Sequence, residues 1–169
     1  MKQIILIAFS IILLSCNGTS KPDSFESCDE IEYYHLDEIK EKKFFSSETK
    51  NDALRNILFQ EESINLKDPK IQEALKEFYN KKIIDEKLRA HISSLFKDQK
   101  METQNASFSA SIAICAPVYR DILIFKKDNK VSGIAKVCFD CSQNLLWTKY
   151  GETLNSPLDY YKLGEYLKK

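Results

Sequence analysis

Five cysteines carry the most distinctive chemistry in this chain. Cys115 is followed by Cys138 and Cys141, and the last two form a C-x-x-C motif. Cys16 and Cys28 stand apart, nearer the amino terminus. Cysteines in such patterns form disulfides, cycle between thiol and disulfide, or bind zinc. Cys28, Cys115, Cys138 and Cys141 are therefore the candidate disulfide or metal-ligating residues.

The surroundings of the C-x-x-C motif favour a structural role. In thiol redox enzymes the first cysteine opens a helix, whose amino terminus lowers the thiol pKa. Cys138 instead ends an apolar segment with β character, and no clear helix follows. Zinc requires four nitrogen or sulfur ligands, and the chain lacks a second C-x-x-C. We expect disulfides or partly buried free cysteines and no cofactor. The alternative is a redox or zinc site that uses Cys115, Cys138 and Cys141.

Other candidate side chains are few. We interpret His35 as a partly exposed strand histidine and His91 as a boundary residue of a helix. Arg120 and Asp121 are polar residues in an apolar strand, with no nucleophile evident beside them. The chain has only four glycines and none of the common hydrolase, zinc-protease, calcium-loop or phosphate-loop motifs. We assign no catalytic residue and favour a protein that is not an enzyme.

The first residues of the chain have the pattern of an export signal. Met1-Lys2 precedes a run at 4–14 that is apolar apart from Ser10 and is too short to span a bilayer comfortably. The run ends in Leu13-Leu14-Ser15-Cys16, which resembles a bacterial lipobox. The resemblance implies that residues 1–15 are removed and that Cys16 is acylated. Two or three acyl chains on Cys16 hold a protein on a membrane.

Processing at Cys16 implies a chain of three parts. Residues 1–15 are the signal peptide, 16–28 a flexible polar tether and 29–169 a single domain. Lys+Arg and Asp+Glu number 25 each, which argues against nucleic-acid binding and against a polybasic membrane-binding face. The expected partners are the membrane, through the lipid on Cys16, and an unknown protein or small molecule. The expected location is the bacterial cell envelope, most simply the outer membrane.

Hydrophobic periodicity predicts a helical half followed by a β half. A strand is expected at 31–36, and the acidic stretch after it could begin a helix. Three amphipathic helices follow, and Asn80-Lys81-Lys82 interrupts the second of them. Their starts are marked by Asn51-Asp52, Asp68-Pro69 and Asp85-Glu86.

The β half begins after a polar connection. Alternation predicts a half-buried strand at 108–114, which could join the sheet as its third strand. The segment 142–155 has no regular pattern, and Trp147 is its expected core residue. A last helix is predicted from Ser156 and Pro157, with Leu158, Tyr161, Tyr166 and Leu167 on its packing face.

A β-hairpin over 117–139 is the predicted centre of the sheet. A tight turn at Asp128-Asn129 sets the register. That register places Asp121 opposite Lys136 as an ion pair and Leu123 opposite Ile134 as an apolar pair.

The same register bears on the cysteines. It places Tyr119 opposite Cys138 and brings Cys115 next to Cys141. A disulfide needs Cα atoms roughly 4.4–6.8 Å apart, so Cys115–Cys141 is the long-range bridge that the register favours. The open question is whether Cys141 bonds to Cys115 or stays free beside Cys138.

The hairpin also carries a family resemblance. Cys115-Ala116-Pro117-Val118-Tyr119-Arg120-Asp121 and Val137-Cys138-Phe139-Asp140-Cys141 are similar to the end of small uncharacterised proteins, many of them exported by Bacteroidetes. In those proteins a C-x-x-P hairpin is closed by I-C-F-x-C. Many of them have Pro-Arg-His where this chain has residues 118–121, so a candidate site histidine is absent here. The resemblance covers the last third of the chain and implies no activity.

Together these patterns predict an α+β domain. We expect an antiparallel sheet of three or more strands, centred on the hairpin 117–139 and covered by about four helices. The expected role is a membrane-anchored envelope lipoprotein that acts as a binding or structural module.

Overall fold

The computed structural model describes Phe25 and residues 27–46, 51–60, 62–97, 115–149, 151–154 and 158–168. Within these residues, six strands form one sheet, flanked by five helices. The strands are β1 (Glu30–Leu36), β2 (Tyr79–Ile83), β3 (Asp121–Lys127), β4 (Lys130–Cys138), β5 (Gln143–Thr148) and β6 (Gly151–Leu154). The helices are α1 (Glu38–Ser46), α2 (Asp52–Phe59), α3 (Pro69–Phe78), α4 (Glu86–Lys97) and α5 (Tyr160–Lys168). None of these described helices is long and apolar enough to cross a bilayer.

The sheet has the strand order β2-β1-β3-β4-β5-β6, and every neighbouring pair is antiparallel. The predicted α+β class and antiparallel sheet are therefore confirmed, and the helix count is close to the four expected. β1 lies beside β3, although α1 to α4 separate them along the chain. This long-range pairing places residues of the amino-terminal strand against the start of the hairpin.

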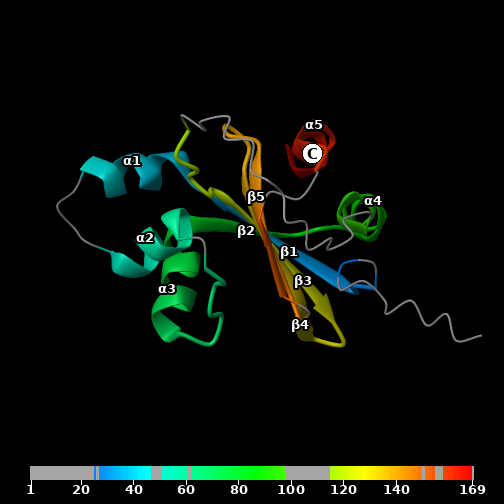
Figure 1. Ribbon diagram of the computed structural model, residues 1–169. Helices are drawn as coiled ribbons and strands as arrows, with labels where there is room; N and C mark the ends of the chain where they lie inside the picture. The colour runs from blue at the N-terminus through cyan, green and yellow to red at the C-terminus, as the bar shows by residue number, and fades with distance from the viewer. Residues whose placement is uncertain are drawn as a thin grey trace, which may run out of the picture.

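Helices cover both faces of the sheet (Figure 1). α2 and α3 lie on one side, and α4 and α5 lie on the other. Strand β3 shows the effect, because Ile122 and Ile124 enter the core under α2 and α3, while Leu123 and Phe125 enter the core under α4 and α5. The sequence of a strand that is buried on both faces is a continuous run of apolar residues rather than an alternation of apolar and polar ones.

The predicted helix starts are formed as the sequence indicates. Asn51 caps α2 by accepting a hydrogen bond from the backbone N–H of Leu54 at 2.9 Å. Asp68 caps α3, and Pro69 occupies its first position. Asp85 accepts from the N–H of Leu88 at the start of α4. The acidic stretch after β1 does form a helix, α1, because Asp37 caps it.

Three strands were not predicted. β2 occupies the stretch that includes Asn80-Lys81-Lys82, where the sequence showed only an interruption. It is an edge strand with mostly exposed side chains, so it lacks an apolar pattern. β5 and β6 occupy much of 142–155, which we expected to be irregular. Trp147 is buried in β5 as predicted.

The hairpin turn is confirmed, but the predicted register is wrong beyond it. Asp128 and Asn129 have positive φ values of 50° and 58°, as a type I′ turn requires. The register shifts by one residue between Phe125 and Lys126. As a result Asp121 pairs with Val137 rather than Lys136, and Leu123 pairs with Ala135 rather than Ile134.

A β-bulge explains the shift. Val131 pairs with Lys126 and Gly133 pairs with Phe125, so Ser132 is one residue extra in β4. Beyond the bulge, Lys136 lies opposite Ile122 and is fully buried. Its Nζ donates to the Gln60 carbonyl at 2.5 Å and lies 4.7 Å from the centroid of the Tyr119 ring. The last pair of the β3–β4 ladder is Asp121 with Val137, so Tyr119, which precedes β3, does not pair with Cys138 as predicted.

The last predicted helix exists, with a later start. α5 begins at Tyr160, and Asp159 caps it by accepting from the N–H of Lys162 at 3.0 Å. Leu167 is buried as expected, whereas Tyr161 is 76% exposed and not part of the packing face. The predicted cap at Ser156 and Pro157 and the strand predicted at 108–114 lie outside the described residues. The strands that flank the hairpin are β1 and β5.

Phe25, which we assigned to the tether, is part of the core. Its ring lies 4.7 Å from that of Phe125 and 5.5 Å from that of Phe96. Cys28, also assigned to the tether, is buried on the same side of the sheet. The packed part of the chain therefore begins before residue 29. Gly133 makes room for Phe25, since a Cβ at this position would lie 2.6 Å from Phe25 Cε1.

We expect Gly133→Ala to lower the free energy of unfolding by about 2 kcal/mol, because overpacking a core usually costs 1–3 kcal/mol. Urea denaturation measures this change. Gly164→Ala is the matched control, since its Cβ would make an ordinary contact 3.5 Å from Phe139 Cε1. That helical substitution should be neutral or should stabilise by about 0.5–1 kcal/mol. Equal stability of Gly133→Ala and the parent would contradict the close contact with Phe25.

Candidate functional site

A cavity of about 760 Å³ lies where α1, α5 and the open end of the β3–β4 hairpin meet. This volume falls within the usual range of small-molecule sites, about 300–1,000 Å³. Its lining comes from β1 and α1, from the segment that enters β3, from the residues that follow β4, and from α5. The lining residues are Tyr33, His35, Glu38, Glu41, Lys42, Val118, Arg120, Asp121, Phe139, Asp140, Tyr160, Tyr161, Gly164, Glu165, Leu167 and Lys168.

A hydrogen-bonded group of three side chains forms one wall. Tyr33 and His35 lie two residues apart on β1 and thus on one face, and His35 pairs with Asp121 across the β1–β3 ladder. The Tyr33 hydroxyl donates to Asp121 Oδ1 at 2.5 Å, and His35 Nδ1 lies 2.8 Å from the same oxygen. The Asp121 side chain is only 7% exposed. A carboxylate only accepts hydrogen bonds, so His35 carries a proton on Nδ1.

The two ring groups respond to this carboxylate in related ways. The hydrogen bond to Asp121 raises the pKa of His35, burial opposes the rise, and the charges of Asp121, Glu38 and Asp37 add to it. Burial raises the pKa of Tyr33 well above its usual range, and the negative charge of Asp121 raises it further. Tyr33 is therefore a neutral hydrogen-bond donor at any physiological pH. His35 gains a proton more readily than an ordinary histidine.

We expect His35 to titrate above the ordinary histidine value of about 6.5. A pKa raised by folding means that the protonated side chain stabilises the folded state fully below about pH 6.5, and this contribution is lost as pH rises through the folded pKa. A pH titration of the imidazole carbon-bound protons by NMR measures the value. Asp121→Asn should bring the pKa back toward 6.5. A His35 pKa at or below 6.5 in the parent would contradict the pairing.

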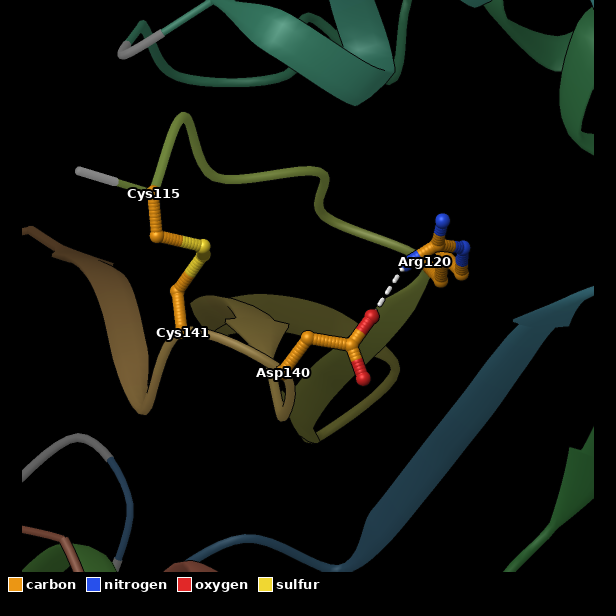
Figure 2. The surroundings of a disulfide bond; sticks show 4 residues. All are labelled: Cys115, Arg120, Asp140 and Cys141. Atoms are coloured by element: carbon orange, nitrogen blue, oxygen red, sulfur yellow. Dashed lines mark hydrogen bonds and ion pairs between the residues drawn. A yellow bond between two sulfur atoms is a disulfide. The ribbon is translucent and has the colours of Figure 1, made fainter.

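Arg120 forms the second polar group of the cavity. Its Nε lies 2.8 and 2.9 Å from the two carboxylate oxygens of Glu41, and its Nη1 lies 2.7 Å from Asp140 Oδ2. Figure 2 shows Arg120 reaching Asp140 beside the disulfide. The guanidinium thus joins α1 to the segment after β4. Because two carboxylates occupy it, Arg120 holds the walls in place rather than offering an open anion site.

Aromatic rings form much of the remaining wall. Phe139 and Tyr160 meet edge to face with centroids 6.4 Å apart. Asn144 Nδ2 donates to the Tyr160 hydroxyl at 2.6 Å and fixes that ring. Tyr161 extends this aromatic surface and is mostly exposed. Gly164 leaves space beside Phe139 that a larger residue would fill.

The candidate cysteines do not gather into one site. Cys115 and Cys141 form the disulfide that the hairpin favoured, with Cα atoms 5.9 Å apart (Figure 2). Cys138 is a buried thiol in the core under α2 and α3. Cys28 is a buried thiol on the opposite face, 3.2 Å from Ser93 Oγ. The described residues hold no group of three His, Cys, Asp or Glu side chains arranged to bind a metal ion.

The disulfide determines the state of the C-x-x-C motif in this structure. Cys141 is bonded to Cys115, so the motif itself is not bridged. Of the three clustered cysteines, only Cys138 keeps its thiol, and it is buried. The disulfide instead ties the segment before β3 to the segment after β4, next to Asp140 at the edge of the cavity.

From the sequence we named some residues of the cavity but predicted the wrong contact partners for them. His35 was interpreted as a partly exposed strand residue, and 44% of its side chain is exposed, but it also binds Asp121. His91 lies away from the cavity and stacks on Tyr166, with centroids 5.5 Å apart. The aromatic residues of the site were missed. The available signal was the position of Asp121, a charged residue directly before the apolar run of β3.

The arrangement supplies a proton donor and acceptor at His35, several carboxylates and aromatic faces. No serine, threonine or cysteine lines the cavity among the described residues. Such a site can hold and orient a small molecule. A comparison with known protein families, curated proteins and solved structures finds no match for this chain, so its function is inferred from its own geometry.

Proposed function

We propose that this protein is a lipid-anchored protein of the bacterial envelope that binds a small molecule in the cavity between α1, α5 and the β3–β4 hairpin. The cavity carries the proposal: about 760 Å³ of space lies beside hydrogen-bonded polar groups that are already in position. Ligand sites of this kind combine apolar walls with a few fixed polar groups.

The polar groups need no ligand to hold them. Asp121 accepts from Tyr33 and His35, and Arg120 is held by Glu41 and Asp140. Tyr33, His35 and Asp121 lie on β1 and β3, which have their own core contacts. The Cys115–Cys141 bridge joins the segment before β3 to the segment after β4, and these two segments hold Arg120 and Asp140. Preorganisation of this sort lowers the entropy cost of binding, which supports a binding role.

Anchoring rests on the lipobox-like sequence that ends at Cys16. Expressed in a Gram-negative host, the full chain should incorporate radiolabelled palmitate and sediment with membranes. Cys16→Ser should abolish both the label and the membrane retention, because the acylated side chain is gone. Cys28→Ser is the matched control and should keep both. A Cys16→Ser chain that fractionates with membranes as the parent does would contradict the anchor.

The binding role has a separate test. The full chain, purified in a neutral detergent, would be screened by thermal shift against small metabolites grouped by charge. Gly164→Leu should reduce every genuine shift, because its side chain would occupy cavity space beside Phe139. Lys162→Leu places the same residue on α5 at an exposed position outside the lining and should leave the shifts intact. If no compound gives a shift that Gly164→Leu abolishes, the cavity is not a binding site.

A further inference from the structure

We propose that the ligand of this cavity is a small organic cation, an amine or ammonium compound with an apolar body. This inference rests on the proposed binding function and names the chemical class of the ligand. Two independent properties of the lining carry it: the balance of its charges and the aromatic surfaces beside those charges.

Carboxylates outnumber permanent cations in the lining. The carboxylates are Glu38, Glu41, Asp121, Asp140 and Glu165, and the permanent cations are Lys42, Arg120 and Lys168. The excess is 5 − 3 = 2 negative charges when His35 is neutral and one when it is protonated. The protein as a whole is balanced, with 25 residues of each sign, so this excess is local. A cavity with a net excess of one sign of charge concentrates ligands of the opposite sign.

The ion pairs within the lining do not remove this excess of negative charge. Arg120 is shared between Glu41 and Asp140, so these three side chains together carry one negative charge. An anionic ligand would have to displace a carboxylate to reach the guanidinium. Glu38 on α1 and Glu165 on α5 are exposed and lie on two of the elements that line the cavity. A cationic group can approach both without breaking an existing ion pair of Arg120.

The aromatic residues complete the match. Tyr33, Phe139, Tyr160 and Tyr161 all line the cavity. The faces of such rings carry partial negative charge and attract an ammonium group placed over them, with a gain of about 0.5–2 kcal/mol. The same rings, with Val118 and Leu167, offer apolar surface to the body of the ligand. Rings and carboxylates thus favour the same class of molecule.

His35 makes the binding sensitive to pH. The groups that face it are Asp121 from β3, Tyr33 from its own strand, and Asp37 and Glu38 at the start of α1. From α5, Glu165 and Lys168 line the same cavity. A proton on His35 adds a positive charge to the site. Affinity for a cation should therefore fall at low pH and rise as His35 loses its proton.

A matched series of ligands tests the class. Isothermal titration calorimetry on the full chain in neutral detergent would compare 2-phenylethylamine with 2-phenylethanol and phenylacetate, which share a ring and differ in charge. We expect the amine to bind at least tenfold more tightly than either of the others. If the alcohol or the acid binds as tightly as the amine or more tightly, and Gly164→Leu weakens that binding, the proposal of a cationic ligand is wrong. The proposed binding function would still stand. If none of the three compounds binds, the proposal of a cationic ligand is also wrong. The wider thermal-shift screen then tests the binding function separately.

Substitutions at exposed residues test which charges affect amine binding without disturbing the fold. Glu165→Gln removes one negative charge and should weaken amine binding about threefold, as expected for a solvent-exposed charge. Lys168→Gln, three residues further along α5, is the matched control and should leave the amine affinity equal or higher. In the parent, amine affinity should rise from pH 5.5 to pH 8, and His35→Gln should abolish that rise. An amine affinity unchanged by Glu165→Gln, or falling with pH, overturns the proposal.

Discussion

Replacing both Cys115 and Cys141 with serine should lower the free energy of unfolding by about 3 kcal/mol. The bridge joins residues separated by 26 positions in the sequence, and it closes the open end of the hairpin. A cross-link of this span removes much of the freedom of the unfolded chain, and its loss typically costs 2–5 kcal/mol. Urea denaturation monitored by the fluorescence of Trp147 measures the change.

Reduction provides the control for this experiment. A thiol reductant should lower the stability of the parent to that of the double variant and should leave the double variant unaffected. Cys28→Ser keeps the bridge and should remain sensitive to reductant, since Cys28 is a free thiol on one face of the sheet. A parent whose unfolding midpoint does not change on full reduction would show that the bridge does not support the fold.

The second large effect is expected at Asp121. Asp121→Ala removes the common acceptor of Tyr33 and His35 and leaves the nearly buried Tyr33 hydroxyl without its partner. A hydrogen bond to a charged group contributes about 1.5–3 kcal/mol, and an unsatisfied buried donor costs about 1–3 kcal/mol. We therefore expect a loss of about 3 kcal/mol in the free energy of unfolding, measured by urea denaturation.

Asp140→Ala is the matched control for Asp121→Ala. Asp140 also accepts a hydrogen bond, from Arg120 at 2.7 Å, but its side chain is 74% exposed. Exposed ion pairs contribute at most about 1 kcal/mol, so this variant should remain close to the parent. Similar losses in the two variants would show that burial does not strengthen the Asp121 contacts. Asp121→Asn should fall between them, because the amide oxygen can still accept from Tyr33.

Local sequence signals predicted the features that depend on a few neighbouring residues. The caps at Asn51 and Asp68 and the turn at Asp128-Asn129 each follow from the chemistry of one or two side chains. The turn also brought Cys115 and Cys141 together correctly, since a one-residue shift moves Cα atoms by only about 3.3 Å along a strand. Such signals survive small errors in register.

The pairings that build the cavity could not be predicted in this way. The bulge at Ser132 is marked only by the adjacent Gly133, a signal that the predicted register did not use, and it moved Asp121 from Lys136 to Val137. The partners that Asp121 does have, Tyr33 and His35, lie 88 and 86 residues away in the sequence. They meet it only because β1 inserts beside β3, and that order is set by the packing of both faces of the sheet.

β2 was missed for a related reason. Lys81 and Glu32 form an ion pair across β1 and β2, and Lys126 from β3 binds the same carboxylate. This network stabilises an edge strand that has little apolar surface. Polar contacts of this kind leave no periodic pattern in a single sequence, so the stretch resembled an interrupted helix.

The burial of Phe25 bears on how the domain would be oriented if the chain is anchored through Cys16. If Cys16 carries the lipid, about nine residues separate the bilayer from Phe25, a reach of at most about 30 Å. Phe25 contacts Phe125 and lies against Gly133, near the turn of the hairpin, whereas the cavity lies at the opposite end of β3, beside Asp121. With a lipid on Cys16, the turn end of the hairpin would be the end tied closer to the bilayer, and we expect the cavity to face the aqueous phase. A ligand would arrive by diffusion through water rather than laterally from the lipid.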